Sequence, residues 1–373
     1  MQATIWHLPT DPAPHLLTGQ TDAGIMRDVI IALLFPAAAG LYFFGGWVLV
    51  MCSVGVGSAV LIEAGYQRMV GKKVTVSDFS AAVTGLLVAL SLPVTAPLWS
   101  IILGNAFAIV VVKQLPGGIG RNVLNPAVAA RVMLKVFFEP RITQWVTPGP
   151  DAVSTATPLE HIGYFTRTVS PELPPLSDLF WGCMGGSIGE TSKFIVLFGF
   201  AYLVWRRVID LRVPTMAVLG TAIVIFLYSG FNLTFTAYHV LSGTLIFAAV
   251  YMVTDYSSGP LTIQARIVFA FMVGGITAAV RILFQLPGGI GVAILIMNLL
   301  SGVLDRYATP RVIGHPKRET HKDLRSLRQP KPDGNNGKSG PINADGKSCV
   351  KLRVINASFK ILTHTRKAIL PLS

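Results

Sequence analysis

The sequence has few charged residues. Asp, Glu, Lys and Arg together make up 13% of the 373 residues, whereas 52% are hydrophobic. An average soluble domain carries roughly 25% charged residues, so this chain could not cover a water-exposed surface of ordinary polarity. The composition therefore argues against a soluble enzyme and predicts an integral membrane protein.

The sequence also lacks several patterns that would indicate other classes of protein. The three cysteines form no C-x-x-C pair, which disfavours a disulfide framework or a zinc site. No G-x-x-x-x-G-K-[ST] loop is present, and no H-x-x-x-H spacing falls within a hydrophobic span, so neither nucleotide triphosphate, metal nor haem binding is indicated. The first 24 residues contain prolines and aspartates instead of the apolar core of a cleavable signal peptide. We expect the first hydrophobic span to act as its own insertion signal.

The net charge of +13 is concentrated in one segment. Residues 306–373 contain 15 Lys or Arg and 4 Asp or Glu, which gives this tail a charge of +11. A basic tail beside a membrane more often determines topology and faces lipid headgroups than binds nucleic acid. We therefore expect no nucleic-acid partner, and we predict a basic cytoplasmic tail that is poorly ordered.

Hydrophobic segments divide the chain into ten predicted spans. A bilayer core of roughly 30 Å requires about 20 apolar residues per helix. By this measure spans lie near 28–44, 46–65, 80–93, 97–113 and 122–138, and again near 189–206, 213–230, 237–254, 265–285 and 289–305. The fold predicted is an all-α membrane protein with two sets of five helices.

Basic residues predict the orientation of these spans. The loops at 94–96 and 231–236 carry no charge. The basic residues follow the second, fourth, sixth and tenth spans and are Arg68, Lys72, Lys73, Lys113, Arg121, Arg206, Arg207, Arg212, Arg306, Arg311 and Lys317. Because loops rich in Lys and Arg stay in the cytoplasm, both termini are predicted to be cytoplasmic.

The two halves share a sequence repeat. Residues 114–120 and 285–291 both read Q-L-P-G-G-I-G, and both copies lie between the fourth and fifth spans of their half. An odd number of spans per half gives the copies opposite orientations, as in the inverted repeats of transporters. The third span, near 80–93, is short, and its counterpart near 242–250 has a related Gly-Thr pattern. Short segments at matching positions predict a substrate or ion site.

These patterns give five predicted regions. They are a cytoplasmic N-terminal segment (1–27), a first five-helix repeat (28–138), an extracytoplasmic loop (139–188), a second five-helix repeat (189–305) and the basic tail (306–373).

The predicted external loop contains one chemically distinctive motif. Residues 151–157 read D-A-V-S-T-A-T and are followed by Pro158, Leu159 and Glu160. Thr157, Pro158 and Glu160 have the spacing of a helix capping box, which is a purely structural explanation. A hydroxyl at a helix N-terminus is also a suitable attachment point for a phosphate, because free backbone N–H groups stabilise the anion.

The motif D-x-x-S-x-A-T in an external loop resembles the flavinylation motif of two related families. They are RnfD, from the Rnf ion-translocating electron transport complex, and NqrB, from the sodium-pumping NADH:quinone reductase. The resemblance covers most of residues 15–305, and the short lead before the first span is closer to RnfD. Further matching segments are V-T-G-L-L-V-A-L-S-L-P at 83–93, L-P-G-G-I-G-R-N-V-L-N-P-A at 115–127 and G-S-I-G-E-T at 186–191.

The resemblance implies a redox function. Thr157 would be the residue that a flavin transferase esterifies to the phosphate of FMN, with Asp151, Ser154 and Thr155 completing the motif. The flavin would relay electrons between the subunits of a complex in the inner (cytoplasmic) membrane, coupled to translocation of Na⁺ or H⁺. The chain would have no complete activity alone. A second, non-covalent flavin, riboflavin, is compatible with this family.

Two alternatives stay open at this point. Within the family, the chain could be of the NqrB type instead of the RnfD type. From spacing alone, the five-plus-five repeat with its short third and eighth spans also fits a solute channel or carrier of the urea or ammonium type. A carrier, however, has no need of D-A-V-S-T-A-T outside the membrane.

Charged residues within or beside the spans are further candidates, because they are costly there. Arg131 and Arg281 are predicted to hold a flavin or a partner subunit. For Glu63, Glu190 and Lys193 we favour a position near the interface, where a long side chain can reach water.

Overall fold

The computed structural model describes residues 21–148, 159, 162–163, 168–169, 173–286 and 288–308. The chain divides into two units, Met1–Pro310 and Arg311–Ser373, and all described residues belong to the first. The basic tail from residue 309 onward and the motif residues Asp151, Ser154, Thr155 and Thr157 therefore lie outside the described residues.

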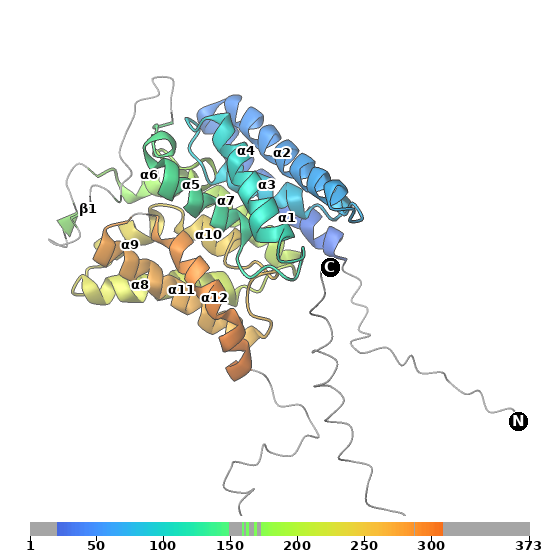
Figure 1. Ribbon diagram of the computed structural model, residues 1–373. Helices are drawn as coiled ribbons and strands as arrows, with labels where there is room; N and C mark the ends of the chain where they lie inside the picture. Colours follow the sequence, from blue (N-terminus) through green and yellow to red (C-terminus); the bar gives the residue numbers. More distant parts are fainter. Residues whose placement is uncertain are drawn as a thin grey trace, which may run out of the picture. The chain divides into compact units, whose positions relative to one another are not determined.

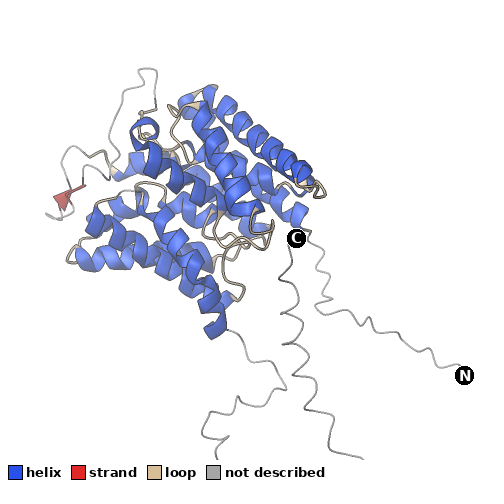
Figure 2. Cartoon of the chain, viewed as in Figure 1, coloured by secondary structure: helices blue, strands red, loops and turns tan. Residues whose placement is uncertain are grey.

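The described chain is built almost entirely of helices, as predicted (Figures 1 and 2). The first half contains α1 (Asp22–Phe44), α2 (Trp47–Met69), η1 (Val76–Asp78), α3 (Ser80–Leu90), α4 (Leu98–Ala106), η2 (Phe107–Gln114) and α5 (Pro126–Ile142). The second contains η4 (Ile188–Glu190), α7 (Lys193–Trp205), α8 (Arg212–Tyr228), α9 (Leu233–Leu241), α10 (Leu245–Tyr251), α11 (Ile263–Phe284) and α12 (Gly289–Ala308). Between them lie α6 (Leu176–Trp181) and a hairpin of two-residue strands, β1 (Ile162–Gly163) and β2 (Thr168–Val169).

Local sequence determines several helix starts. Thr21 caps α1 by accepting a hydrogen bond from the Gly24 N–H, and Thr262 caps α11 in the same way through the Ala265 N–H. Asn125 caps α5, whose first residue is Pro126, a position where the missing N–H of proline costs no hydrogen bond. These caps satisfy backbone donors that would otherwise be exposed within or near a membrane.

Each predicted span coincides with a helix or a pair of helices. By length and composition α1, α2, α11 and most of α12 could each cross a bilayer, and α9 with α10 qualifies as one bent span. The segments α3, α4 with η2, α7 and α8 are shorter apolar helices, and α5 has 17 residues with a kink at Phe138. The described helices thus form a multi-pass membrane protein, while the count of ten crossings stays a prediction.

The third and eighth spans are the irregular ones. Helix α3 has only 11 residues, and every one of them is buried. Helices α9 and α10 are bent by 56° at a break around residues 242–244, and most of α10 is buried. Interrupted backbone is tolerated at membrane depth only where protein surrounds it, which explains why these two elements are central.

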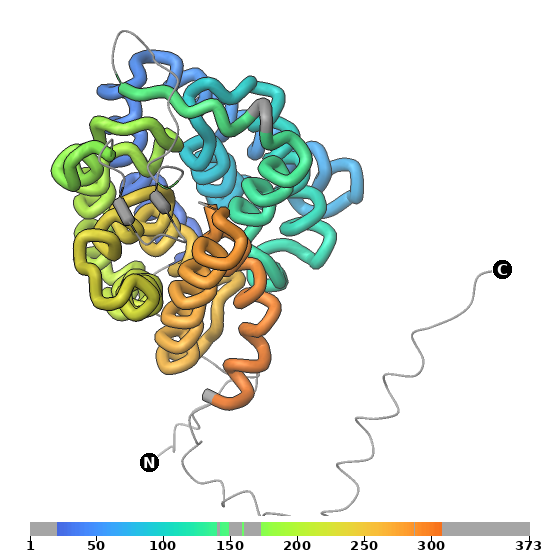
Figure 3. Tube along the Cα trace, turned by 90° about the vertical axis from the view of Figure 1, so that its left-hand side faces the viewer, coloured from blue at the N-terminus to red at the C-terminus, as the bar shows by residue number. Residues whose placement is uncertain are grey.

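Small residues allow the central helices to pack closely. Gly55 of α2 and Gly85 of α3 face each other, and a Cβ on Gly55 would lie only 2.6 Å from the Gly85 carbonyl oxygen. Gly220 of α8 packs against the backbone of α11 at Phe271, and Gly274 of α11 packs against the backbone of α8 at Ala217. Such small-residue contacts drive helix association where lipid removes the hydrophobic force between helices. Figure 3 shows α11 and α12 side by side, with α5 next to α12.

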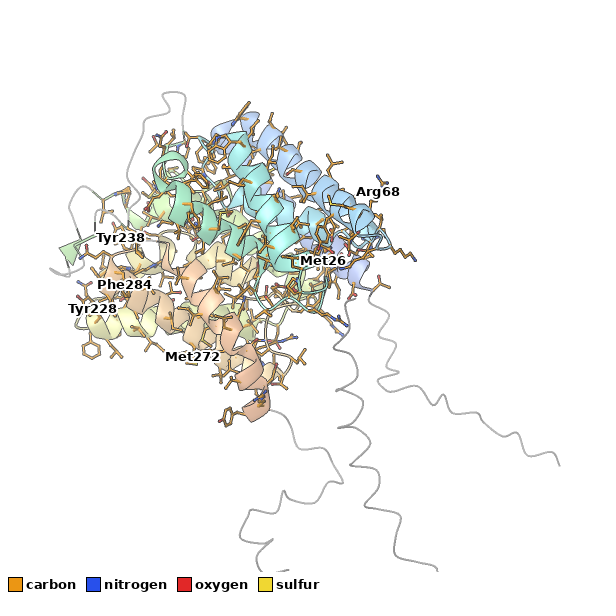
Figure 4. The ribbon with its side chains drawn as sticks, viewed as in Figure 1. Met26, Arg68, Tyr228, Tyr238, Met272 and Phe284 are labelled. Carbon is orange, nitrogen blue, oxygen red and sulfur yellow. The ribbon has the colours of Figure 1, made fainter. Side chains whose placement is uncertain are left out.

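Labelled residues at the helix ends lie on two opposite sides of the bundle, while the predicted orientation stays a prediction. Figure 4 shows Met26 at the start of α1 and Arg68 at the end of α2 on one side of the bundle. Tyr228 and Phe284, at the ends of α8 and α11, lie on the opposite side. The second group is aromatic, which is typical of a membrane interface.

Candidate functional site

A cavity with both apolar and charged lining lies beside the break between α9 and α10, and we refer to it as the Arg131 cavity. Its volume is about 200 Å³. Its walls come from the end of α3, one side of α5, the break itself and the α11–α12 turn, and include Ser91, Arg131, Val132, Lys135, Val136, Glu139, Ile142, Trp145, Leu159, Glu190, Gly243, Thr244, Leu286 and Gly289. The lining is mostly apolar with a few charged groups, as in typical ligand sites.

Cations dominate the buried charge around this cavity. Lys135 Nζ lies 3.7 Å from the exposed Glu139 carboxylate, so that pair is largely self-compensated. Glu190 is 5% exposed, and Arg131 and Lys193 both interact electrostatically with it. Two cations therefore share one buried carboxylate, which leaves the cavity able to accept an anion.

A short 3-10 helix fixes Glu190. The Ser187 N–H donates to Glu190 Oε1 at 2.9 Å, which makes a capping box on η4. The Lys193 ammonium donates to the Glu190 carbonyl oxygen at 2.7 Å. The Ile188 N–H donates to the Leu92 carbonyl oxygen, which ties η4 to the end of α3.

Arg281 holds the break between α9 and α10. Its side chain is fully buried, and Nη1 donates to the His239 carbonyl oxygen at 2.6 Å. Nη2 lies 3.5 Å from the Ser242 carbonyl oxygen. These carbonyls are at the C-terminal end of α9. The last carbonyl groups of a helix have no hydrogen-bond donors within the helix, and the helix dipole favours a positive charge there.

A second cavity lies at the N-terminus of α5, and we refer to it as the Asn125 cavity. Polar groups in its wall come from several elements: Ser80, Thr84, Lys113, Asn122, Asn125, Thr254, Asp255, Tyr256 and Ser257. Asn125 Nδ2 donates to Asp255 Oδ2 at 3.1 Å, while its Oδ1 caps α5. Burial and the negative charges of Asp22, Asp255 and Asp78 raise the pKa of Tyr256 to about 12, so its hydroxyl stays neutral at ordinary pH.

A buried ion pair borders the same cavity. Lys113 Nζ lies 2.6 Å from Glu63 Oε1, and the two side chains are 2% and 0% exposed. Gln114 Nε2 donates to the same carboxylate, and Lys113 donates to Ser80 Oγ at the start of α3. Lys113 belongs to η2, a π-helical segment, a type of irregularity that is frequent at functional sites.

The sequence-based expectations had mixed outcomes. Asp151, Ser154, Thr155 and Thr157 lie outside the described residues, but Leu159 is described and is 1% exposed in the wall of the Arg131 cavity. Arg131 lines that cavity, whereas Arg281 binds backbone carbonyls of its own chain. A role for either in holding a flavin or a partner subunit stays a prediction.

Three expectations on charged residues were wrong. Glu63, Glu190 and Lys193 were expected to reach water at an interface, but they are 0%, 5% and 7% exposed. Each has a partner inside the protein. The expectation failed because hydropathy indicates how deep a residue lies in the membrane but not whether its helix face meets lipid, water or another helix.

Sequence analysis also missed Lys113 and Asp255. Lys113 was assigned to a cytoplasmic loop because it follows an apolar segment, yet it is buried and paired with Glu63. Asp255 follows α10 and meets Asn125 across the two halves. The only sequence signal for either residue was a charge at the margin of a predicted span. Such a charge supports the hypothesis of a site inside the membrane.

Comparison with known proteins gives concordant matches. Residues 9–314 match the family described as NQR2, RnfD, RnfE. The chain is 37% identical to the D subunit of the Na⁺-translocating ferredoxin:NAD⁺ oxidoreductase complex of Acetobacterium woodii, over 83% of this chain and 96% of that protein. It is 32% identical to the D subunit of the proton-translocating ferredoxin:NAD⁺ oxidoreductase complex of Clostridium ljungdahlii (81% and 95%). It is also 32% identical to the D subunit of the ion-translocating oxidoreductase complex of Stutzerimonas stutzeri (79% and 92%).

Proposed function

The chain belongs to the NQR2, RnfD, RnfE family, and we propose that it is the RnfD-type membrane subunit of an ion-translocating oxidoreductase complex. The observation that carries this proposal is the similarity over more than 90% of the length of relatives that bear this name. The first two of these relatives are subunits of Na⁺-translocating and proton-translocating complexes, and we propose that the complex of this chain translocates one of these two ions. As one subunit, it acts only with its partners.

We further propose that Thr157 carries FMN through a phosphoester bond. The motif D-A-V-S-T-A-T supports this assignment, with Asp151, Ser154 and Thr155 as the residues that a flavin transferase reads. Thr157 lies two residues before Leu159, and two extended residues span at most roughly 7 Å. The Arg131 cavity has properties that suit such a group: a cation shared with Glu190, and an apolar lining that includes Trp145.

A bound flavin would supply one-electron and two-electron chemistry. The residues of this chain would bind and orient it. Arg131 and Lys135 would stabilise the negative phosphoester, because opposite charges attract strongly in a site with little water. Val132, Val136 and Ile142 would cover an apolar ring and exclude water from it.

Fluorescence of the denatured chain tests the ester. The chain, produced in cells that express a flavin transferase, should give a fluorescent band on a denaturing gel. The band should disappear in Thr157→Ala and persist in Thr215→Ala, a control outside the motif and outside the Arg131 cavity whose hydroxyl donates to its own helix at Leu211. A dark wild-type band from such cells would sink the flavin assignment.

We propose the Asn125 cavity as the place for a second, non-covalent flavin. Its amide, hydroxyl and carboxylate groups suit the polar edge of a flavin ring, and Val83, Leu87 and Val250 supply apolar wall. Thr84→Ala with Asp255→Asn should lower the amount of riboflavin released on denaturing the purified complex. Ser229→Ala, outside the cavity wall and hydrogen-bonded to its own helix at Phe226, should leave the amount unchanged. Equal release from all variants would contradict this placement.

We propose the inner (cytoplasmic) membrane as the location, with both termini cytoplasmic. The distribution of Lys and Arg and the separation of helix ends in Figure 4 support this orientation. A reporter that is active only in the cytoplasm should be active when fused after Ser373. Activity of a reporter that works only outside the cytoplasm would reverse the orientation.

A solute channel or carrier is the second candidate, favoured by the short α3 and the broken α9–α10 pair. Liposomes containing the purified chain alone should then show flux of urea or ammonium. The redox proposal expects no such flux and instead requires ion movement driven by electron transfer in the assembled complex. Movement of radioactive Na⁺ that persists with a protonophore would identify the ion as Na⁺.

A further inference from the structure

Glu190 occupies a position between two cavities. On one side it lines the Arg131 cavity, and on the other a pocket of about 20 Å³ formed with Thr191, Lys193, Ser242 and Gly243. Both lie beside the break between α9 and α10. Glu190 Oε1 accepts the Ser187 N–H, whereas Oε2 is buried and has no hydrogen-bond partner among the described residues.

The small pocket has room for water. A pocket of this size holds about one molecule, which needs at least two polar partners. Three such atoms around η4 and the break are buried without a hydrogen bond in the described chain: Glu190 Oε2, Ser187 Oγ and Ser242 Oγ. These atoms indicate a site for one or two bound waters that contact the carboxylate.

The charged groups that face Glu190 come from two packed helices. Arg131 on α5 and Lys193 on α7 interact with it electrostatically. Lys135 and Glu139 lie across the Arg131 cavity as a pair, and Arg281 with His239 lies beyond Ser242. The described residues of α1, α3 and α10 that pack on η4 add no charged side chain near it.

We propose that Glu190 takes up a proton when an anion occupies the Arg131 cavity, so that Arg131 acts as a counter-ion shared between the anion and Glu190. A phosphate ester is the anion class that Arg131, Lys135 and an apolar wall would accept. This inference rests on the proposed function, because the anion in the working complex would be the FMN phosphoester. Reduction of the flavin would add further negative charge to the same cavity.

The balance of charge around the buried Glu190 carboxylate gives the reason. With the cavity empty of anions, Arg131 and Lys193 balance the Glu190 carboxylate. An anion bound by Arg131 weakens that balance and adds a repulsive charge nearby, and like charges close together in low dielectric cannot both stay ionised without cost. Protonation of Oε2 removes the second negative charge, and the neutral hydroxyl can donate to the bound water.

The step is balanced without further reactants. The proton comes from water through the pocket beside Ser242 and forms an O–H bond at Oε2, and the carboxylate becomes a carboxylic acid. Release of the anion returns the proton. Glu190 is thus a proton-binding residue whose state follows the charge in the cavity.

Inorganic phosphate provides a test that does not depend on a flavin. In the flavin-free Thr157→Ala chain, saturating phosphate should cause uptake of up to one proton per chain, measured with a pH-indicator dye. Infrared difference spectra should show a new protonated-carboxyl band. Both signals should be absent from Glu190→Gln in the same background, and both should remain in Asp210→Asn, which changes an exposed carboxylate outside the walls of both cavities.

Glu190→Gln is a suitable variant because an amide oxygen can still accept the Ser187 N–H, and its folding is checked by thermal unfolding. Phosphate binding without proton uptake, a carboxyl band that persists in Glu190→Gln, or no phosphate binding at all would each overturn the proposal. A dark gel band for the wild-type chain would instead overturn the flavin assignment and leave the phosphate result standing by itself.

Discussion

Lys113 Nζ and Glu63 Oε1 lie 2.6 Å apart, and neither side chain reaches solvent. The pair joins η2 to α2 beside the start of α3, with Gln114 and Ser80 as further hydrogen-bond partners. It couples the short third span to its neighbours by charge, whereas most other helix contacts here are apolar or depend on glycine.

Breaking this pair on one side should destabilise the protein strongly. Lys113→Met would leave the Glu63 carboxylate buried without its cation, a change that costs about 3–5 kcal/mol in comparable cases. The double variant Lys113→Met with Glu63→Gln should lose much less, since no charge is then left buried. Thermal unfolding of the wild-type chain, the two single variants and the double variant in detergent measures the coupling. Additive losses would show that the two residues act independently.

Gly85→Ala should disrupt the contact between α2 and α3. A Cβ at this position would collide with the Gly55 backbone, and overpacking of this kind costs about 1–3 kcal/mol. Gly57→Ala is the matched control, because a Cβ there meets nothing within 4 Å and alanine favours the helix. We expect a lower unfolding temperature for the first and an equal or higher one for the second. The reverse order would contradict the close packing of these two helices.

Arg281→Met should loosen the break between α9 and α10. It removes the donors to the His239 and Ser242 carbonyls, and hydrogen bonds from charged groups contribute about 1.5–3 kcal/mol each. Hydrogen exchange of amides in residues 239–247 should accelerate. Arg266→Met, near the other end of α11, where the arginine donates to the Pro260 carbonyl, should leave those amides unaffected. Unchanged exchange in Arg281→Met would show that packing alone fixes the bend.

The stability of the chain should fall between pH 10 and pH 12 through Tyr256. Burial, followed by the charges of Asp22, Asp255 and Asp78, raises the pKa of this phenol from 10.0 to about 12. Above pH 10 the unfolded chain loses the proton while the folded chain keeps it, so unfolding becomes more favourable as the pH rises. The unfolding temperature measured across this range should fall less in Tyr256→Phe. Identical curves for the two proteins would exclude Tyr256 as the cause.

The candidate site was only partly readable from sequence. The loop motif pointed to residues 151–157, and G-S-I-G-E-T contributed to the family resemblance, but neither revealed that Glu190 faces Arg131. These two residues are far apart in sequence and meet because η4 is tied to the end of α3 through the Ile188 and Leu92 backbones. No local pattern encodes such a contact, since it depends on the packing of both halves.

The repeated heptapeptide shows the same limit. In the first copy Gly117, Gly118 and Gly120 have positive φ values, and α5 begins only at Pro126. In the second copy Gln285 takes the left-handed conformation, and α12 begins at Gly289, inside the repeat. Identical letters therefore adopt different structures, because Gly289 packs tightly against Val280 of α11 whereas the first copy forms an open turn beside Arg121.

The sequence by itself determined that this chain lies in a membrane, roughly where its apolar helices lie along the chain, and which family it resembles. Those properties follow from local composition, since lipid requires long apolar segments whose backbone bonds are satisfied within each helix. Only the tertiary structure decided which charged residues are buried together. A charge is stable inside the bundle only where partners from distant helices meet it, as Lys113 meets Glu63 and as Arg131 and Lys193 surround Glu190.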